Sequence, residues 1–295
     1  MITWKLKHWR TLGVAATTLG LAACGGGGGE GGGENGGEGG HGEAGETAIG
    51  ENNGATPAPA TATEPAGEAG ESAAGEAGGE HGEAGVVTAY AGLSGDTLTA
   101  LRIQHLRGFV MAAAKVVEDR GSFSGEPADA AILVQQGLLE VYEPAADQFG
   151  SLDVTSLREA AAGTTFTRAQ MMQRLRTAQE ELTRAIGTLD YDDAQLVVRM
   201  VDMSTGLYQN VLVDGIADPT EYQHSMGAAL AAQQAILLHQ DTMRRENLGA
   251  YSRAVGELNR FVALWPAREP GANPATYQQV LVQGSRVRLA LSPFL

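Results

Sequence analysis

Few side chains of this chain could carry chemistry, and the best candidate set is His105, Glu221 and His224. Asp202 is a fourth possible member of the set. Imidazole nitrogens and carboxylate oxygens are ligands that suit iron and copper. These residues therefore predict, as one of two alternatives, a metal site in the folded domain, provided that the fold brings His105 to the others. The competing interpretation is that each His is an ordinary surface or half-buried side chain.

A second candidate lies where two predicted helices meet. Gly215 can adopt a positive φ and end the first helix, because Gly is the usual residue just past a helix C-terminus. Asp218 is a preferred N-cap, Pro219 suits the first helical position, and Glu221 can reach back to the cap. The pattern predicts a tight corner between two helices. The functional alternative is a ligand at the edge formed by Glu221 and His224, where the helix dipole favours an anion.

Other kinds of chemistry are excluded by composition and by missing motifs. The chain has 295 residues, a formal net charge of −15 and one Cys. An acidic chain of this kind lacks the basic face that nucleic-acid binding requires, and one Cys cannot form an internal disulfide or a Cys-based zinc site. The sequence contains no phosphate-binding Gly-rich loop, no HExxH and no GxSxG motif. Since no nucleophile–base pair is visible either, we expect a protein that is not an enzyme.

The N-terminus has the pattern of a bacterial export signal. Lys5, Lys7 and Arg10 form a basic start, and Thr11–Ala23 is an apolar run that is too short to span a bilayer as a helix. The run ends in Leu21-Ala22-Ala23-Cys24, which resembles the lipobox of bacterial lipoproteins. An ordinary signal peptide followed by a chance Cys is the competing interpretation.

The lipobox resemblance implies where the protein is cut and anchored. Cleavage would fall between Ala23 and Cys24, so that residues 1–23 are the signal peptide and the Cys24 thiol carries lipid. Acyl chains then hold the protein on a membrane by burying their CH₂ groups. Gly25, rather than Asp, follows the lipidated residue. By resemblance to Gram-negative sorting, this implies the periplasmic face of the outer membrane, whereas a Gram-positive host would place the protein outside its single membrane.

Residues 24–90 are predicted to be a disordered tether that begins with the lipidated Cys. Gly, Glu and Ala dominate this stretch, and Ile49 is the only large aliphatic residue between positions 25 and 85. Such a segment cannot bury enough apolar surface to offset the entropy of ordering it. His41 and His81 begin two copies of the sequence His-Gly-Glu-Ala-Gly, which we interpret as repeat slippage rather than as a metal-collecting arm.

Residues 91–295 are predicted to form an all-α bundle of seven or eight helices. Apolar residues recur at spacings of three and four, and no sustained alternation or hairpin signal appears. Pro127, Asp218-Pro219 and Asn273-Pro274 mark expected helix starts, and Pro144 an expected kink. Glu180 is expected to pair on a solvent-exposed face with the arginines four residues before and after it.

Three segments resemble a family of uncharacterised Gly/Glu-linked lipoproteins of proteobacteria. They are the helix–turn–helix of residues 196–237, the step Leu106-Arg107-Gly108-Phe109, and the segment 142–149. The helical domains of that family are similar to those near imelysin-like proteins and in the periplasmic part of Ftr-type iron permeases. The family often has His after the Arg-Gly step, where this chain has Phe109. The resemblance therefore implies a helical fold and a periplasmic location more than it implies metal binding.

Two functions remain open from the sequence. In the first, the helical domain is a non-catalytic binding or scaffold module that is tethered to the membrane and serves metal uptake or an unknown periplasmic protein partner. In the second, it is a metal-binding helical bundle, for iron or copper, that uses His105, Glu221 and His224. The first needs no bound cofactor, and the second needs a metal ion.

Overall fold

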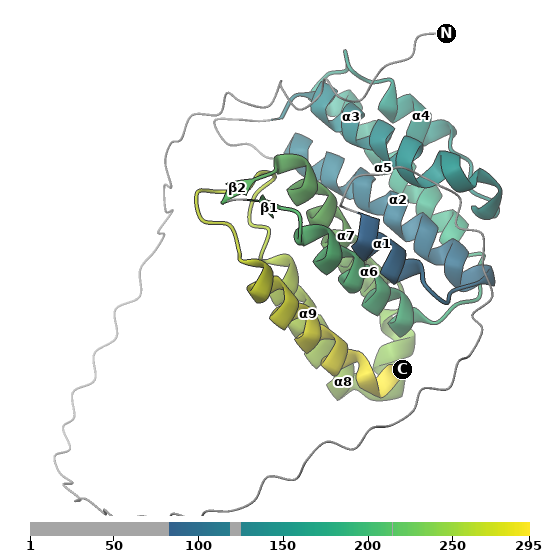
Figure 1. Ribbon diagram of the computed structural model, residues 1–295. Coiled ribbons are helices and arrows are strands. Elements are labelled where there is room, and N and C mark those ends of the chain that lie inside the picture. Colours follow the sequence, from purple (N-terminus) through teal and green to yellow (C-terminus); the bar gives the residue numbers. More distant parts are fainter. Residues whose placement is uncertain (1–82, 119–124, 214) are drawn as a thin grey trace, which may run out of the picture. The chain divides into compact units, whose positions relative to one another are not determined.

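Nine α-helices and one short hairpin make up the part of the chain that the computed structural model describes, residues 83–118, 125–213 and 215–295 (Figure 1). The predicted all-α class is confirmed, with nine helices in the described part rather than seven or eight. The predicted signal peptide, Cys24 and most of the predicted tether lie outside the described residues. The helices are Glu83–Tyr90 (α1), Gly95–Glu118 (α2), Pro127–Gly137 (α3), Thr155–Ala161 (α4), Arg168–Ile186 (α5), Asp193–Tyr208 (α6), Pro219–Leu238 (α7), Gln240–Val262 (α8) and Tyr277–Leu291 (α9).

The folded domain begins at Glu83, inside the stretch predicted to be tether, and not at residue 91. Helix α1 lies against α6, where the backbone of Gly85 touches that of Gly206, and Ala89 is fully buried. The last residues before position 91 include two Val and a Tyr, which supply the apolar surface that the Gly/Glu-rich stretch before them lacks. The tether prediction therefore extended too far toward the C-terminus.

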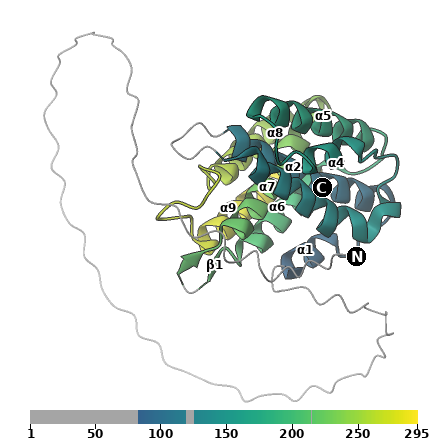
Figure 2. The ribbon, with the colours of Figure 1, turned by 90° about the horizontal axis from the view of Figure 1, so that it is seen from above.

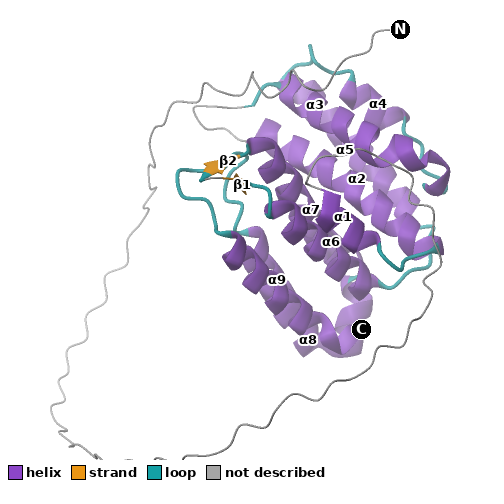
Figure 3. Cartoon of the chain, in the orientation of Figure 1, coloured by secondary structure: helices purple, strands orange, loops and turns teal. Residues whose placement is uncertain are grey.

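Helices α2 and α7 form the centre of the domain. Helix α2 packs against α3 and α5 as well as α7, and α7 packs against α6 and α8 (Figures 1 and 2). The C-terminal pair α8 and α9 lies beside α6, which α9 contacts directly. Figure 3 shows how little of the described chain is not helical. Among these helices, none is both long enough and apolar enough to cross a bilayer.

Close backbone contact sets the distance between α2 and α7. Gly108 of α2 faces Gly227 of α7, and a Cβ added to Gly108 would lie 3.0 Å from the Gly227 carbonyl carbon. One turn away, the Gln104 side-chain amide donates to the backbone oxygen of Ala231. The earlier residue on α2 pairs with the later residue on α7, so the two helices are antiparallel. Small residues at this crossing bring the side chains that flank it close together.

Local signals explain most helix starts. Thr167 and Thr276 each cap a helix in a capping box, Asp192 caps α6, and Pro127 occupies the first turn of α3 as expected. Helix α9 begins at Tyr277, three residues later than Asn273-Pro274 would place it, because Thr276 and the Gln three positions after it form the stronger cap.

The chain after α3 bends where Pro144 was expected to disturb it. A π turn over Leu138–Tyr142 leads into a 3₁₀ segment over Glu143–Gln148, inside which Ala145 has non-helical angles of φ −144° and ψ 35°. Proline lacks an N–H and its ring clashes with the preceding turn, so the regular helix cannot continue through it. A last 3₁₀ turn, Ser292–Phe294, ends the chain.

A short hairpin replaces the direct helix–helix corner expected at Gly215. Helix α6 already ends at Tyr208, and the strands Leu212–Val213 (β1) and Ile216–Ala217 (β2) follow as an antiparallel pair. Gly215 has φ +79° as predicted, but it lies in the loop of this hairpin and does not end a helix. The two positions between the strands are Asp214-Gly215, a pair that favours a hairpin turn, but strands of two residues leave no alternation that would have shown them.

Candidate functional site

The fold brings His105 and His224 to the same aromatic ring. His105 lies on α2 and His224 on α7, and their rings are 5.6 Å and 4.9 Å from that of Phe109, measured between centroids. The hydroxyl of Tyr90, at the end of α1, lies 3.0 Å from His105 Nδ1. The fold thus places both histidines beside one phenylalanine ring.

Burial keeps both histidines neutral. It lowers the pKa of His105 to about 3, with added repulsion from His224 and Arg102. It lowers the pKa of His224 to about 4, although the Asp218 carboxylate opposes the shift. Since the ordinary value is about 6.5, neither ring is charged at neutral pH. The His224 Nε2 atom is out of contact with solvent and has no hydrogen-bond partner among the described residues.

The remaining predicted ligands do not complete a metal site in the described part of the chain. No group of three or more His, Cys, Asp or Glu side chains there is placed to hold a metal ion. Glu221 lies on the first turn of α7, half-buried and one turn before His224. Asp202 forms an ion pair with a residue outside this set, since its Oδ1 is 2.6 Å from Arg288 Nε of α9. Burial raises the pKa of Asp202, and the nearby Arg288 opposes that shift.

Asp218 and Pro219 occupy the cap and the first position of α7 that the sequence predicts. The Asp218 carboxylate accepts hydrogen bonds from the backbone N–H groups of Thr220 (2.8 Å) and Glu221 (3.2 Å), and Pro219 is the first helical residue. The rings of Tyr208 and Tyr222 lie 6.5 Å apart across the seam between α6 and α7. The cap therefore sets where α7, the helix that carries His224, begins after the hairpin.

Sequence reasoning missed a chain of hydrogen bonds around His239. Its Nε2 is 2.6 Å from the hydroxyl of Tyr191, and its Nδ1 is 2.9 Å from Oδ2 of Asp193. Burial and the Asp193 carboxylate raise the pKa of the Tyr191 phenol to about 12. These hydrogen bonds connect the end of α7 to the start of α6. No sequence signal could have shown them, because the residues involved are brought together only by tertiary packing.

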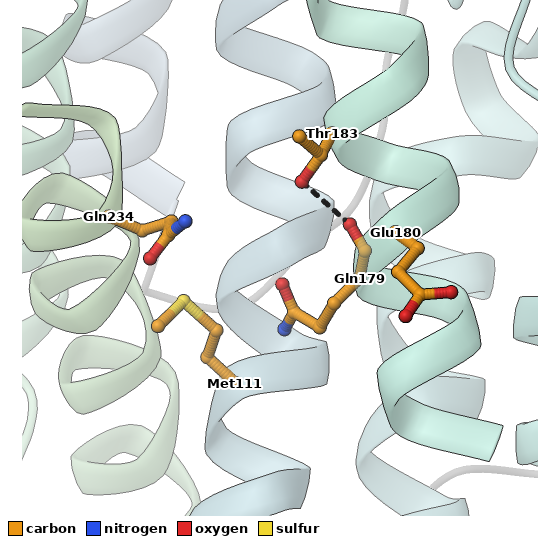
Figure 4. Close-up of a pocket in the computed structure, with 5 residues that line it drawn as sticks. All are labelled: Met111, Gln179, Glu180, Thr183 and Gln234. Carbon is orange, nitrogen blue, oxygen red and sulfur yellow. Dashed lines mark hydrogen bonds between the residues drawn. The ribbon is translucent and has the colours of Figure 1, made fainter. Parts of the chain in front are cut away.

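A groove between α2, α5 and α7 was missed as well. It has a volume of about 440 Å³ and is lined by Met111, Gln179, Glu180, Thr183 and Gln234 (Figure 4). Beside it, Arg107 of α2 is fully buried and donates from Nη2 to Thr183 Oγ1 at 3.0 Å. Because Arg is normally exposed, no sequence pattern indicated that this one is buried.

No protein-family model, curated protein or solved structure matches this chain. The functional proposals therefore depend on its residues and on the geometry described above.

Proposed function

We propose that this chain is a lipid-anchored bacterial lipoprotein whose helical domain is a non-catalytic binding or scaffold module. The observation that carries the proposal is Leu21-Ala22-Ala23-Cys24, with the only Cys of the chain at the end of a basic and then apolar start. The Cys24 thiol carries the lipid, and the Gly/Glu-rich residues after it separate the anchor from the helical domain. By resemblance to Gram-negative sorting, Gly25 directs the protein to the periplasmic face of the outer membrane.

The binding role is supported by two features of the helical domain. The groove between α2, α5 and α7 presents amide, hydroxyl and carboxylate groups next to the apolar side chain of Met111. Next to it, a buried guanidinium has donor groups that no described residue uses. A buried polar group without a partner requires an explanation, and a bound ligand would be one. A periplasmic protein is the second kind of partner that this proposal includes.

Replacing Cys24 tests the anchor. Cys24→Ser removes the thiol that takes the lipid, so the protein should leave the membrane fraction or stay unprocessed. The measurement is fractionation of cells with detergent extraction and intact-mass analysis of the product. Gly26→Ser, which changes a residue after the lipidated one, is the matched control and should stay anchored. A Cys24→Ser protein that still fractionates as a processed, detergent-extractable lipoprotein would overturn the proposal.

The sorting step has a separate test. Gly25→Asp should move the protein from the outer to the inner membrane while leaving it lipidated, which density-gradient separation of the two membranes measures. An unchanged distribution would contradict the outer-membrane assignment without affecting the lipid anchor.

Metal binding is the second candidate function, and one observation favours it. His105 and His224 are neutral, and neutral imidazole is the form that binds metal. A specific metal would stabilise the fold by RT ln(1 + [L]/Kd), so about 100 times Kd of iron, copper or zinc should add about 2.7 kcal/mol. Melting of the full chain with each metal, and of the His224→Gln variant beside it, measures this. An unchanged melting temperature with all three metals would exclude the second candidate.

A further inference from the structure

Arg107 is a cation buried in the middle of α2. It is 0% exposed, and its Nη2 donates one hydrogen bond, to Thr183 Oγ1 at 3.0 Å. Its Nε and Nη1 are out of contact with solvent and have no partner among the described residues. Burial lowers its pKa to about 10, so the guanidinium stays charged at neutral pH. Most of its five N–H donors are therefore unused.

No carboxylate of the described chain balances this charge. The described ion pairs join other residues, and the phenol of Tyr191 is the ionisable group near Arg107 that would raise its pKa. That phenol is neutral, because burial and Asp193 raise its pKa to about 12. A buried charge without a partner costs far more free energy than a paired one. The missing group is an anion that can reach Arg107.

The groove is connected to Arg107 through Thr183, which lines it and accepts a hydrogen bond from the guanidinium. Met111, one turn after Arg107 on α2, forms part of the groove wall, and Thr183 of α5 forms another part (Figure 4). The guanidinium is thus one hydrogen bond away from the wall. Thr183 Oγ1 also donates to the backbone oxygen of Gln179 at 2.8 Å. The hydroxyl keeps that partner when a ligand replaces it as the acceptor for Arg107.

Other polar groups of the groove are also available. No hydrogen bond joins the side-chain amide of Gln179 or of Gln234 to another described residue. Glu180 does not form the ion pairs expected from its spacing, because Arg184 pairs with Glu181 instead, at 2.6 Å. The groove therefore offers amide donors and acceptors and one exposed carboxylate, in addition to the buried guanidinium beside it.

We propose that the groove between α2, α5 and α7 binds a small organic carboxylate that also carries an amino group. Arg107 holds the ligand's carboxylate, since the guanidinium fork matches a carboxylate in two parallel hydrogen bonds. Glu180 faces the amino group and disfavours a second negative charge on the ligand. The inference rests on the binding role proposed above and names its ligand class. It does not depend on the lipid at Cys24.

The probe is 4-aminobutyrate, compared with butyrate and with butylamine, each of which keeps only one of the two charged groups. The readout is the methyl NMR signal of Met111 in the full chain labelled at its Met methyl groups, assigned through Met111→Leu. We expect a saturable shift with 4-aminobutyrate, a weaker one with butyrate and none with butylamine. Glu180→Gln should remove the advantage of 4-aminobutyrate over butyrate.

Two arginine variants form a matched pair. Arg107→Met should lose at least about tenfold in affinity and should melt no lower than the wild type without ligand, because it removes an unpaired buried charge. Arg253→Met removes the same charge from the exposed face of α8 and should bind as the wild type does. Arg107→Lys, which keeps the charge but loses the fork, covers the case in which the Met variant does not fold. It should bind about tenfold more weakly.

The proposal is overturned if no probe gives a saturable shift, or if Arg107→Met binds as well as the wild type. It is also overturned if deletion of residues 30–80 alone moves the Met111 signal and probes bind only afterwards. The carboxylate would then come from the chain's own Glu residues rather than from a separate ligand. Because all readouts come from the helical domain, failure here leaves the Cys24 fractionation test untouched.

Discussion

The two histidines on Phe109 make folding depend on pH. In the unfolded chain a His has a pKa of about 6.5, whereas in the folded domain the pKa values of His105 and His224 are about 3 and about 4. Below about pH 6.5 the unfolded state therefore binds more protons, and stability falls as the pH drops toward 4. The slope is at most about 1.4 kcal/mol per pH unit for each His. Urea midpoints at pH 7 and pH 5 measure the loss.

Variants separate these histidines from other titrating groups. Most carboxylates protonate below pH 5, so the window from pH 7 to pH 5 reports mainly on His. His105→Gln with His224→Gln should flatten the pH dependence in that window, while His41→Gln, which lies outside the described residues, should leave it unchanged. Equal midpoints at pH 7 and pH 5 for the wild type would show that the two rings are not buried in the neutral form.

The Asp218 cap gives a second prediction for a single residue. Asp218→Ala removes the carboxylate that accepts two backbone N–H groups at the start of α7. The variant should lose about 1 kcal/mol of unfolding free energy. Asp147→Ala removes the same charge from an exposed position with no described partner and should change stability by less than about 0.5 kcal/mol. Denaturant unfolding of both variants measures the difference, and equal losses would mean that the cap contributes nothing specific.

Among the helices, the crossing of α2 and α7 tolerates the least change. A Cβ on Gly227 would overlap the backbone oxygen of Gly108, which cannot move aside as a side chain does. Gly227→Ala should therefore cost about 1–3 kcal/mol by overpacking. Gly256→Ala on α8 is the control, because nothing lies within 4 Å of the added Cβ. That variant should gain up to about 1 kcal/mol from helix propensity. If both alanines stabilise the fold, α2 and α7 are farther apart than described.

At the scale of helices and strands, the sequence predicted those features that depend on residues close together in the chain. The starts at Pro127 and Asp218-Pro219 were predictable because a cap acts within one helical turn. The predicted start of α9 was three residues too early, because Asn273 and Thr276 are both possible caps. Helix α1 and the β1–β2 hairpin were missed, since α1 depends on its contact with α6 and each strand has two residues.

The candidate site was predictable only in part, for a similar reason. His105 and His224 could be chosen by residue type, but their meeting at Phe109 depends on the antiparallel packing of α2 and α7. Arg107 was noted only as part of a resemblance, because nothing in its neighbours shows that it is buried. The groove combines side chains from three helices, and no sequence spacing relates them.

For the molecule as a whole, the helical domain should fold without most of the Gly/Glu-rich stretch. Residues 30–80 contain Ile49 as their only large aliphatic side chain, so they have little apolar surface to contribute to a core. Deleting them should leave the thermal melt, followed by circular dichroism, unchanged within error. A variant that lacks residues 83–90 is the contrasting case and should melt lower, because it loses α1 and the buried Ala89. A clear fall in melting temperature for the first deletion would show that the stretch packs on the domain.

The position of α1 also determines how mechanical load enters the protein. With the proposed anchor held at Cys24 and a partner pulling on the domain, tension reaches the bundle through Glu83 and must pass along α1. That helix has eight residues, and its contact with α6 includes small residues such as Gly85 and Gly206. Ala89 is the one fully buried apolar residue among its described side chains, so opening this helix alone costs less than unfolding the whole domain. Helix α1 therefore peels away first and lengthens the connection, and the remaining helices stay folded under the load.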